Sequence, residues 1–124
     1  MDIDSQTVTK SVNTPFPKEE KSTTSRVSAV NGLYKLLADS YALLIKTHNY
    51  HWNATGPNFY GFHTLTEAKY SELFTSIDDI AEKVRTLGEK VPASLKHFGD
   101  LSDVVEPNSQ LNINGMILDL VQRT

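Results

Sequence analysis

Two long stripes of apolar residues, each at the three- and four-residue spacing of an α-helix, constrain the fold of this chain more than any other feature. The first consists of Val30, Leu33, Leu37, Tyr41, Leu44, His48 and His51, and the second of Phe62, Leu65, Leu73, Ile77, Ile80, Val84 and Leu87. Between them, Gly56, Pro57 and Asn58 interrupt the helical pattern, because proline lacks an amide hydrogen and disfavours a helical residue before it. Two long helices joined by so short a turn are expected to form an antiparallel hairpin.

The chain after the second stripe predicts shorter helices. The second helix is expected to start at Asn58 or Phe59 and to run to Leu87, with Gly88 as a left-handed cap. The connection over residues 89–112 is expected to include a short helix at residues 93–98, and Asn114 is expected to cap a last helix. The apolar residues of that last helix are Met116, Ile117, Leu120 and Val121. The predicted fold class is therefore all-α.

The N-terminal segment differs in composition from the rest. Residues 1–25 hold few apolar side chains and many Ser, Thr, Lys and Glu residues, so they bury too little surface to offset the entropy lost on ordering. We therefore expect a flexible tail over residues 1–25 and a single helical domain over residues 26–124. The helical pattern of that domain starts at Val27.

Composition excludes several classes of function. The absence of cysteine excludes disulfides and thiolate metal sites and favours a reducing compartment such as the cytoplasm. No apolar run is long enough to span a membrane, and the N-terminus lacks the apolar core of a signal peptide. The net charge of −3 argues against a surface that attracts nucleic acid as a whole. The tail is not a basic arm either, because its lysines are balanced by Asp and Glu.

Five side chains with nitrogen or oxygen donors lie at helical spacing, one at the end of the first helix and four along the second. They are His51, His63, Glu67, Asp78 and Glu82. Taken singly, a histidine on an apolar stripe is more often a hydrogen-bonded core residue, and a helix carboxylate is more often solvated. As a set, the four on the second helix lie at about 0°, 40°, 60° and 100° around its axis, on one face apart from the apolar stripe. Such a set suits a metal ion that prefers nitrogen and oxygen ligands, and His48 is assigned a structural or supporting role beside it.

The distance along the helix adds a constraint on how a metal site forms. The centre of His63 and Glu67 lies about 15 residues, or roughly 22 Å, from the centre of Asp78 and Glu82. A single chain cannot bring both pairs to one ion. Two copies can do so if their second helices pack antiparallel about a two-fold axis near Glu72 and Leu73. His51 then joins from the end of the first helix, and each dimer holds two equivalent sites.

The same residues resemble the Dps family, the mini-ferritins of bacteria and archaea. The resemblance is carried by His51-Trp52-Asn53, by Gly56-x-Asn58-Phe59, by His63 and Asp78, and by Ala81-Glu82-Lys83. It extends from about Val27 to Leu101. It implies a ferritin-like four-helix bundle that assembles into a hollow dodecamer.

The resemblance also implies an activity and roles for individual residues. His51, His63 and Glu67 from one subunit, with Asp78 and Glu82 from its partner, would bind Fe(II), and Trp52 would stand near the site. In that family Fe(II) is oxidised to Fe(III), preferentially by hydrogen peroxide, and the ferric product is stored in the cavity. This ferroxidase activity protects against oxidative stress.

Two departures from the family pattern are visible in the sequence. Glu67 stands where the family usually has Asp, so this carboxylate reaches one methylene further. The family continues through a third and a fourth helix, whereas this sequence ends at Thr124. The expected domain is therefore about two and a half of the four helices, incomplete at the C-terminus.

Two other functions remain as alternatives. Some members of the family compact DNA through lysine-rich tails, which would place the protein at the nucleoid, although the neutral tail here speaks against it. The chain could instead be an inactive remnant that serves only as a helical interaction module. That alternative predicts that iron has no effect on assembly or stability.

Overall fold

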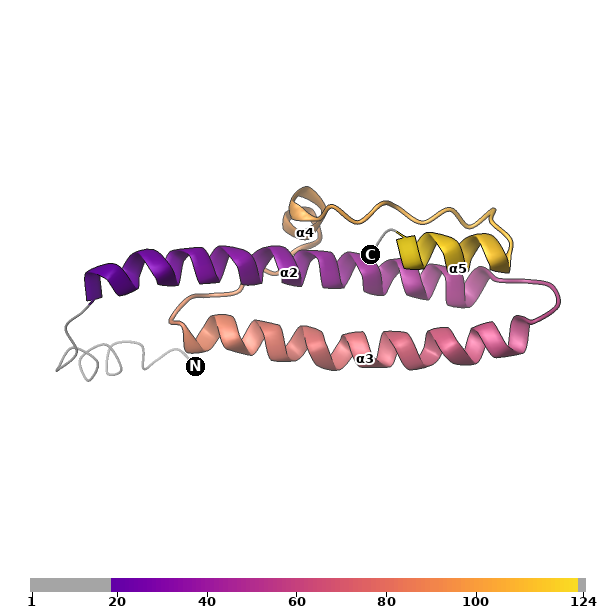
Figure 1. Ribbon diagram of the computed structural model, residues 1–124, viewed down its shortest axis with the longest axis horizontal. Coiled ribbons are helices and arrows are strands. Elements are labelled where there is room, and N and C mark those ends of the chain that lie inside the picture. Colours follow the sequence, from indigo (N-terminus) through magenta and orange to yellow (C-terminus); the bar gives the residue numbers. More distant parts are fainter. Residues whose placement is uncertain (1–18, 123–124) are drawn as a thin grey trace.

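The computed structural model describes residues 19–122 and shows a helical hairpin with two short helices packed beside it (Figure 1). The long helices α2 (Glu19–Asn53) and α3 (Phe59–Thr86) run antiparallel. The short helix α4 (Leu95–Leu101) packs on α2, and the connection after it runs along α2 to α5 (Ile113–Gln122). The described residues contain no strand, which agrees with the predicted all-α class.

The hairpin forms where the sequence predicts it, with one difference at its start. Helix α2 begins at Glu19, eight residues before Val27, and no proline or glycine in between stops it. The first 18 residues of the predicted flexible tail lie outside the described residues. Gly56 and Asn58 turn the chain with positive φ angles of 102° and 70°, a conformation that glycine and asparagine tolerate best.

Capping side chains set the bounds of the shorter elements. Gly88, with φ of 88°, ends α3 as predicted, and its amide donates to the Arg85 carbonyl at 2.9 Å. Ser94 caps α4 by accepting a hydrogen bond from the His97 amide at 3.1 Å. The predicted cap of α5 was wrong: Asn112, not Asn114, accepts the Gly115 amide at 2.8 Å, because α5 already begins at Ile113.

The core consists of two clusters along the hairpin. Around the middle, side chains of α2 and α3 pack with one residue of α4; these are Leu37, Ala38, Leu44, Ile77 and Phe98. Near the turn, α5 completes a second cluster of Tyr50, Ala54, Phe62, Ile113 and Met116. Leu65, assigned to the apolar stripe, is instead 51% exposed. It lies at the side of the stripe and lines a groove of about 520 Å³ between α2, α3 and α5.

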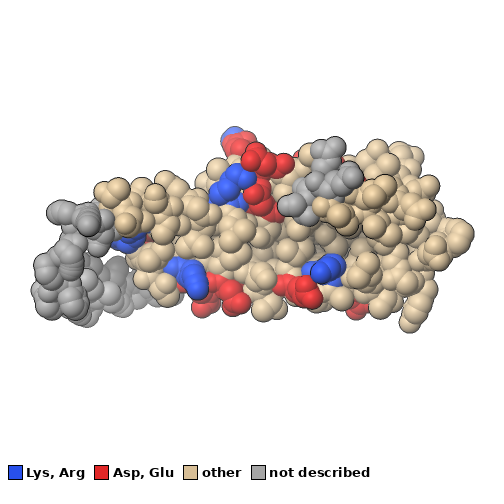
Figure 2. Space-filling model, in the orientation of Figure 1, with Lys and Arg blue, Asp and Glu red and all other residues tan. Residues whose placement is uncertain are grey.

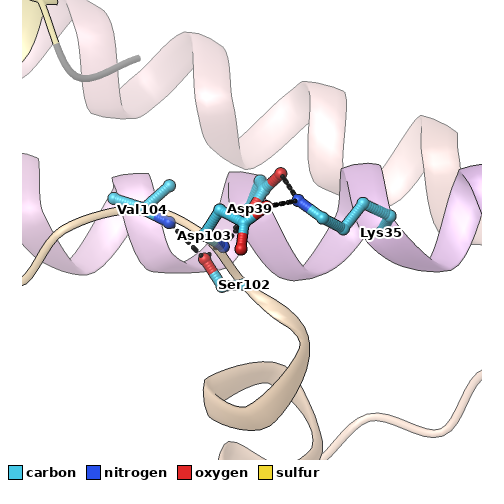
Figure 3. A network of polar contacts seen from close by, with 5 residues as sticks. All are labelled: Lys35, Asp39, Ser102, Asp103 and Val104. Carbon is cyan, nitrogen blue, oxygen red and sulfur yellow. Dashed lines mark hydrogen bonds and ion pairs between the residues drawn. The ribbon is translucent and has the colours of Figure 1, made fainter.

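A polar network fastens the connection after α4 to α2 (Figure 3). The Asp39 carboxylate accepts hydrogen bonds from the Lys35 ammonium at 2.7 Å, the Ser102 hydroxyl at 2.9 Å and the Asp103 amide at 2.9 Å. Burial alone would raise the pKa of Asp39, but these donors outweigh burial and hold the pKa below its ordinary value. Asp39 is therefore an ionised anchor for the chain on its way to α5.

A second polar group lies inside the contact between α2 and α5. The side chain of Lys46 is fully buried, and its Nζ lies 3.0 Å from Asp119 Oδ2. The Tyr50 hydroxyl donates to the same oxygen at 2.6 Å and accepts the Asn108 amide at 3.0 Å. Burial and the nearby Asp119 raise the pKa of Tyr50, which keeps its hydroxyl protonated as a donor. α5 is thus tied to α2 by charge as well as by apolar contact.

Candidate metal centre

Two histidines meet where the hairpin turns. His51 lies in the last turn of α2, and His63 lies in the second turn of α3. Their rings stack with centroids 3.7 Å apart and planes 22° apart. His51 is buried and His63 is half-buried. The five residues between the helices are therefore enough to bring together two imidazoles that are twelve positions apart in sequence.

Thr66 fixes the orientation of the His51 ring. Its hydroxyl oxygen lies 2.8 Å from His51 Nδ1, 2.9 Å from the Phe62 carbonyl and 3.1 Å from the His63 carbonyl. A helical threonine commonly donates its one hydroxyl hydrogen to a carbonyl three or four residues earlier. If that hydrogen goes to a carbonyl, the oxygen is left to accept a hydrogen bond from His51 Nδ1, and the lone pair of a neutral His51 then lies on Nε2.

The backbone of α2 orients the second ring. His63 Nδ1 lies 3.3 Å from the His51 carbonyl, which can only accept a hydrogen bond, so His63 Nδ1 is the donor. The carbonyls of the last helical turn have no amide partner within their helix, and α2 ends two residues later at Asn53. Because the His51 carbonyl at this helix end accepts a hydrogen bond from His63 Nδ1, the lone pair of a neutral His63 is on Nε2.

The surroundings favour the neutral form of His51. Burial lowers its pKa, and the neighbouring His63 lowers it further, while the nearby Glu67 carboxylate acts in the opposite direction. Only a neutral imidazole binds a metal ion. His51 is therefore favoured in the protonation state that a metal ligand requires.

Aromatic side chains line the α2 side of the pair. Trp52 stacks on His48 with centroids 4.8 Å apart and planes 2° apart. Tyr70 of α3 contacts His48 at 4.3 Å and meets the His51 ring edge-on at 5.1 Å. Trp52 is 69% exposed, so one face of this cluster is open to solvent. His48 contacts Trp52 and Tyr70, and its supporting role stays a prediction.

The three predicted carboxylates all lie on the exposed part of α3. Glu67, Asp78 and Glu82 are exposed. Glu67 follows the histidine pair directly, whereas Asp78 and Glu82 lie about three to four helical turns further on. Over residues 19–122, no three His, Asp or Glu side chains of one copy are grouped so as to hold a metal ion. The structure therefore brings His51 and His63 into contact, places Glu67 one helical turn after His63, and leaves Asp78 and Glu82 distant.

Two residues of the site are absent from the prediction. Thr66 and Tyr70 touch His51, yet neither stands out in the sequence. For Thr66 the sequence offers one indication. A helical threonine commonly bonds to a carbonyl three or four residues earlier, which here are the carbonyls of His63 and Phe62. Tyr70 has the corresponding spacing of seven from His63 on the same helix face.

The comparison with protein families decides which group this hairpin belongs to. The family model of the ferritin-like domain matches residues 30–123. The chain belongs to the ferritin-like family. Within that family its similarity is to Dps proteins. The Dps protein of Bacillus brevis superposes with a TM-score of 0.76 at 28% identity, covering 79% of this chain and 66% of that one.

Further relatives agree with this assignment. The Vibrio cholerae O1 Dps protein, described as a member of the ferritin-like diiron-carboxylate superfamily, superposes with a TM-score of 0.77 at 28% identity and covers 81% of this chain and 63% of its own. DNA protection during starvation protein 2 of Bacillus anthracis is 36% identical over 85 residues, which are 68% of this chain and 58% of the relative. A low temperature-induced protein of Nostoc sp. is 43% identical over 98 residues, 78% of this chain and 55% of the relative. The chain thus spans little more than half the length of these curated relatives.

Proposed function

We propose that this chain binds Fe(II) at a site shared between two copies, oxidises it and stores the ferric product, which protects the cell against oxidative stress. The observation that carries the proposal is the stacked pair of His51 and His63. Both Nδ1 atoms are engaged by the protein, which leaves both Nε2 lone pairs for a metal ion. The similarity to Dps and diiron-carboxylate proteins supports iron as the metal.

The second half of the site comes from a second copy in this proposal. When two α3 helices pack antiparallel, His63 lies level with the partner's Glu82, and Glu67 lies level with the partner's Asp78. Both pairs of positions share one midpoint, between Glu72 and Leu73. Phe74 lies close to that midpoint on the same face and is 63% exposed, so it offers apolar surface for the contact. By resemblance to Dps, such dimers assemble further into a closed shell of about twelve copies.

The ligand set suits the oxidation chemistry. Carboxylates stabilise Fe(III) more than Fe(II), so the paired Glu67 and Asp78 favour loss of an electron, and few ligands per ion leave room for an oxidant. Hydrogen peroxide accepts one electron from each of two Fe(II) ions and, with two protons, forms two water molecules. The cytoplasm is the compartment that we propose, because Fe(II) persists where conditions are reducing.

The first test is anaerobic loading with Fe(II) followed by a pulse of hydrogen peroxide, with ferric absorbance as the readout. The unchanged chain should form Fe(III) much faster than buffer does, and His51→Ala and Asp78→Ala should each lose this activity. If the unchanged chain is no faster than buffer, the proposed activity is wrong.

Mixing the two single variants tests whether the site is shared. In a mixed dimer, one site takes its histidines from the Asp78→Ala copy and its carboxylate from the His51→Ala copy, and is therefore intact. Random exchange should restore about a quarter of the intact sites, because half the dimers are mixed and each has one good site. A site built within one chain would recover nothing on mixing.

The two alternatives from the sequence remain to be tested. DNA binding has little support from charge, since acidic and basic side chains are interspersed on the face shown in Figure 2; a gel shift in low salt would reveal it. The interaction-module alternative predicts that Fe(II) changes neither the oligomeric state nor the melting temperature.

A further inference from the structure

We infer that Thr66 is a positioning residue that holds His51 in the tautomer with its proton on Nδ1, and so presents Nε2 to the metal ion. The inference rests on the proposed function for its consequence, iron binding. The tautomer itself follows from the contacts of the metal-free chain.

The hydrogen-bond inventory around Thr66 carries the argument. The hydroxyl has one hydrogen to donate and lies within reach of two carbonyls, those of Phe62 and His63, which can only accept. With that hydrogen committed to a carbonyl, the oxygen presents a lone pair to His51 Nδ1 at 2.8 Å. A proton on Nδ1 completes this bond, whereas a proton on Nε2 would set two lone pairs against each other.

Burial gives the contact its selectivity. Thr66 is 1% exposed and His51 is 5% exposed, so water does not reach the Nδ1 atom to replace a lost partner. The Nδ1–H tautomer is thereby favoured before any metal arrives. A metal-binding histidine commonly donates its other ring nitrogen to a protein group, and loss of such a partner weakens metal binding by about 10–100-fold.

Thr47 provides a matched control for the substitution. It is also a buried helical threonine, 2% exposed, and its hydroxyl donates to the Leu43 carbonyl at 2.8 Å. Thr66→Val and Thr47→Val each replace a hydroxyl by a methyl group at a buried helix position. Only the first removes a partner from a histidine. Thr66→Ser keeps the hydroxyl and serves as the conservative rescue.

The first readout is the tautomer of His51, measured in the metal-free protein by two-bond ¹H–¹⁵N correlation of the imidazole nitrogens and assigned with His51→Ala. The unchanged chain, Thr66→Ser and Thr47→Val should show the proton on Nδ1. Thr66→Val should show a mixture or the Nε2–H form. If Thr66→Val retains the Nδ1–H pattern, the inference is overturned.

The second readout is anaerobic titration with Co(II), whose absorbance spectrum reports its coordination. Thr66→Val should bind Co(II) about 10–100-fold more weakly than the unchanged chain, and Thr66→Ser and Thr47→Val should bind within about twofold of it. Equal weakening in Thr66→Val and Thr47→Val would assign the effect to packing and refute the positioning role. If the unchanged chain binds no Co(II), the proposed metal site fails, and the imidazole spectra still decide whether Thr66 sets the tautomer.

Discussion

The buried pair of Lys46 and Asp119 yields an asymmetric prediction. The Lys46 side chain is fully buried, while the Asp119 side chain is 17% exposed and also accepts the Tyr50 hydroxyl. Asp119→Asn removes the charge that balances the ammonium and leaves a buried cation facing a neutral amide. Removing one partner of a buried ion pair costs about 3–5 kcal/mol, and the solvent-exposed edge of Asp119 favours the lower end, near 3 kcal/mol.

Replacing the lysine instead of the aspartate should reduce the stability far less. Lys46→Met keeps the length and apolar stem of the side chain and removes the group that is costly to bury. The Asp119 carboxylate keeps the Tyr50 hydroxyl at 2.6 Å and some solvent, so the expected loss is about 1 kcal/mol or less. The double variant Lys46→Met/Asp119→Asn should lie close to Lys46→Met, which makes the magnitude of the coupling between the two positions about 3 kcal/mol.

Urea unfolding followed by far-ultraviolet circular dichroism at pH 7 measures these free energies. The order of stability should be unchanged chain, then Lys46→Met and the double variant together, then Asp119→Asn. Equal losses for the two single variants, or strict additivity in the double variant, would refute the reasoning that the buried ammonium dominates the energy of the pair.

Three further predictions concern the rest of the fold. Because the pKa of Asp39 is lowered in the folded state, the unchanged chain should be more stable than Asp39→Asn above the unfolded pKa of about 3.9, by about 1 kcal/mol. That advantage should be lost as the pH falls through the folded pKa, and urea titrations from pH 7 to 3 would show a constant difference if Asp39 is not responsible. Gly88→Ala should cost about 1–2 kcal/mol in chemical unfolding, since φ is 88° at this cap; a neutral effect would mean that the cap is not left-handed in solution. Met116→Ala should cost roughly 3 kcal/mol and lower the melting temperature, because this side chain is fully buried between α5 and α2; a loss below about 1 kcal/mol would show that α5 is not packed there.

The hairpin was predictable because apolar periodicity and turn residues act locally. The stripes, the break at Gly56 to Asn58 and the cap at Gly88 can be recognised within a few residues of chain, and the structure agrees with them except at Leu65, which is exposed. The cap of α5 was misjudged because Asn112 and Asn114 are chemically identical candidates. The choice between them depends on where Ile113 packs in the cluster around Tyr50, which is a tertiary contact.

The sequence indicates candidate ligands but not the residues that contact them. Histidines and carboxylates are typical metal ligands, and helix geometry predicts that those of the second helix share one face. Thr66 is an ordinary helical threonine until the structure shows His51 beside it. The ion pair of Lys46 could not be predicted either, because its partner Asp119 lies 73 positions later in the chain.

The turn between α2 and α3 also has a kinetic consequence. His51 meets Thr66 and His63 across only 15 and 12 residues of chain, whereas the Asp119 contact closes a loop several times longer. Short loops close in well under a microsecond and at small entropic cost. The contact between the two imidazoles is therefore a product of local chain closure, and it can form before α5 has docked.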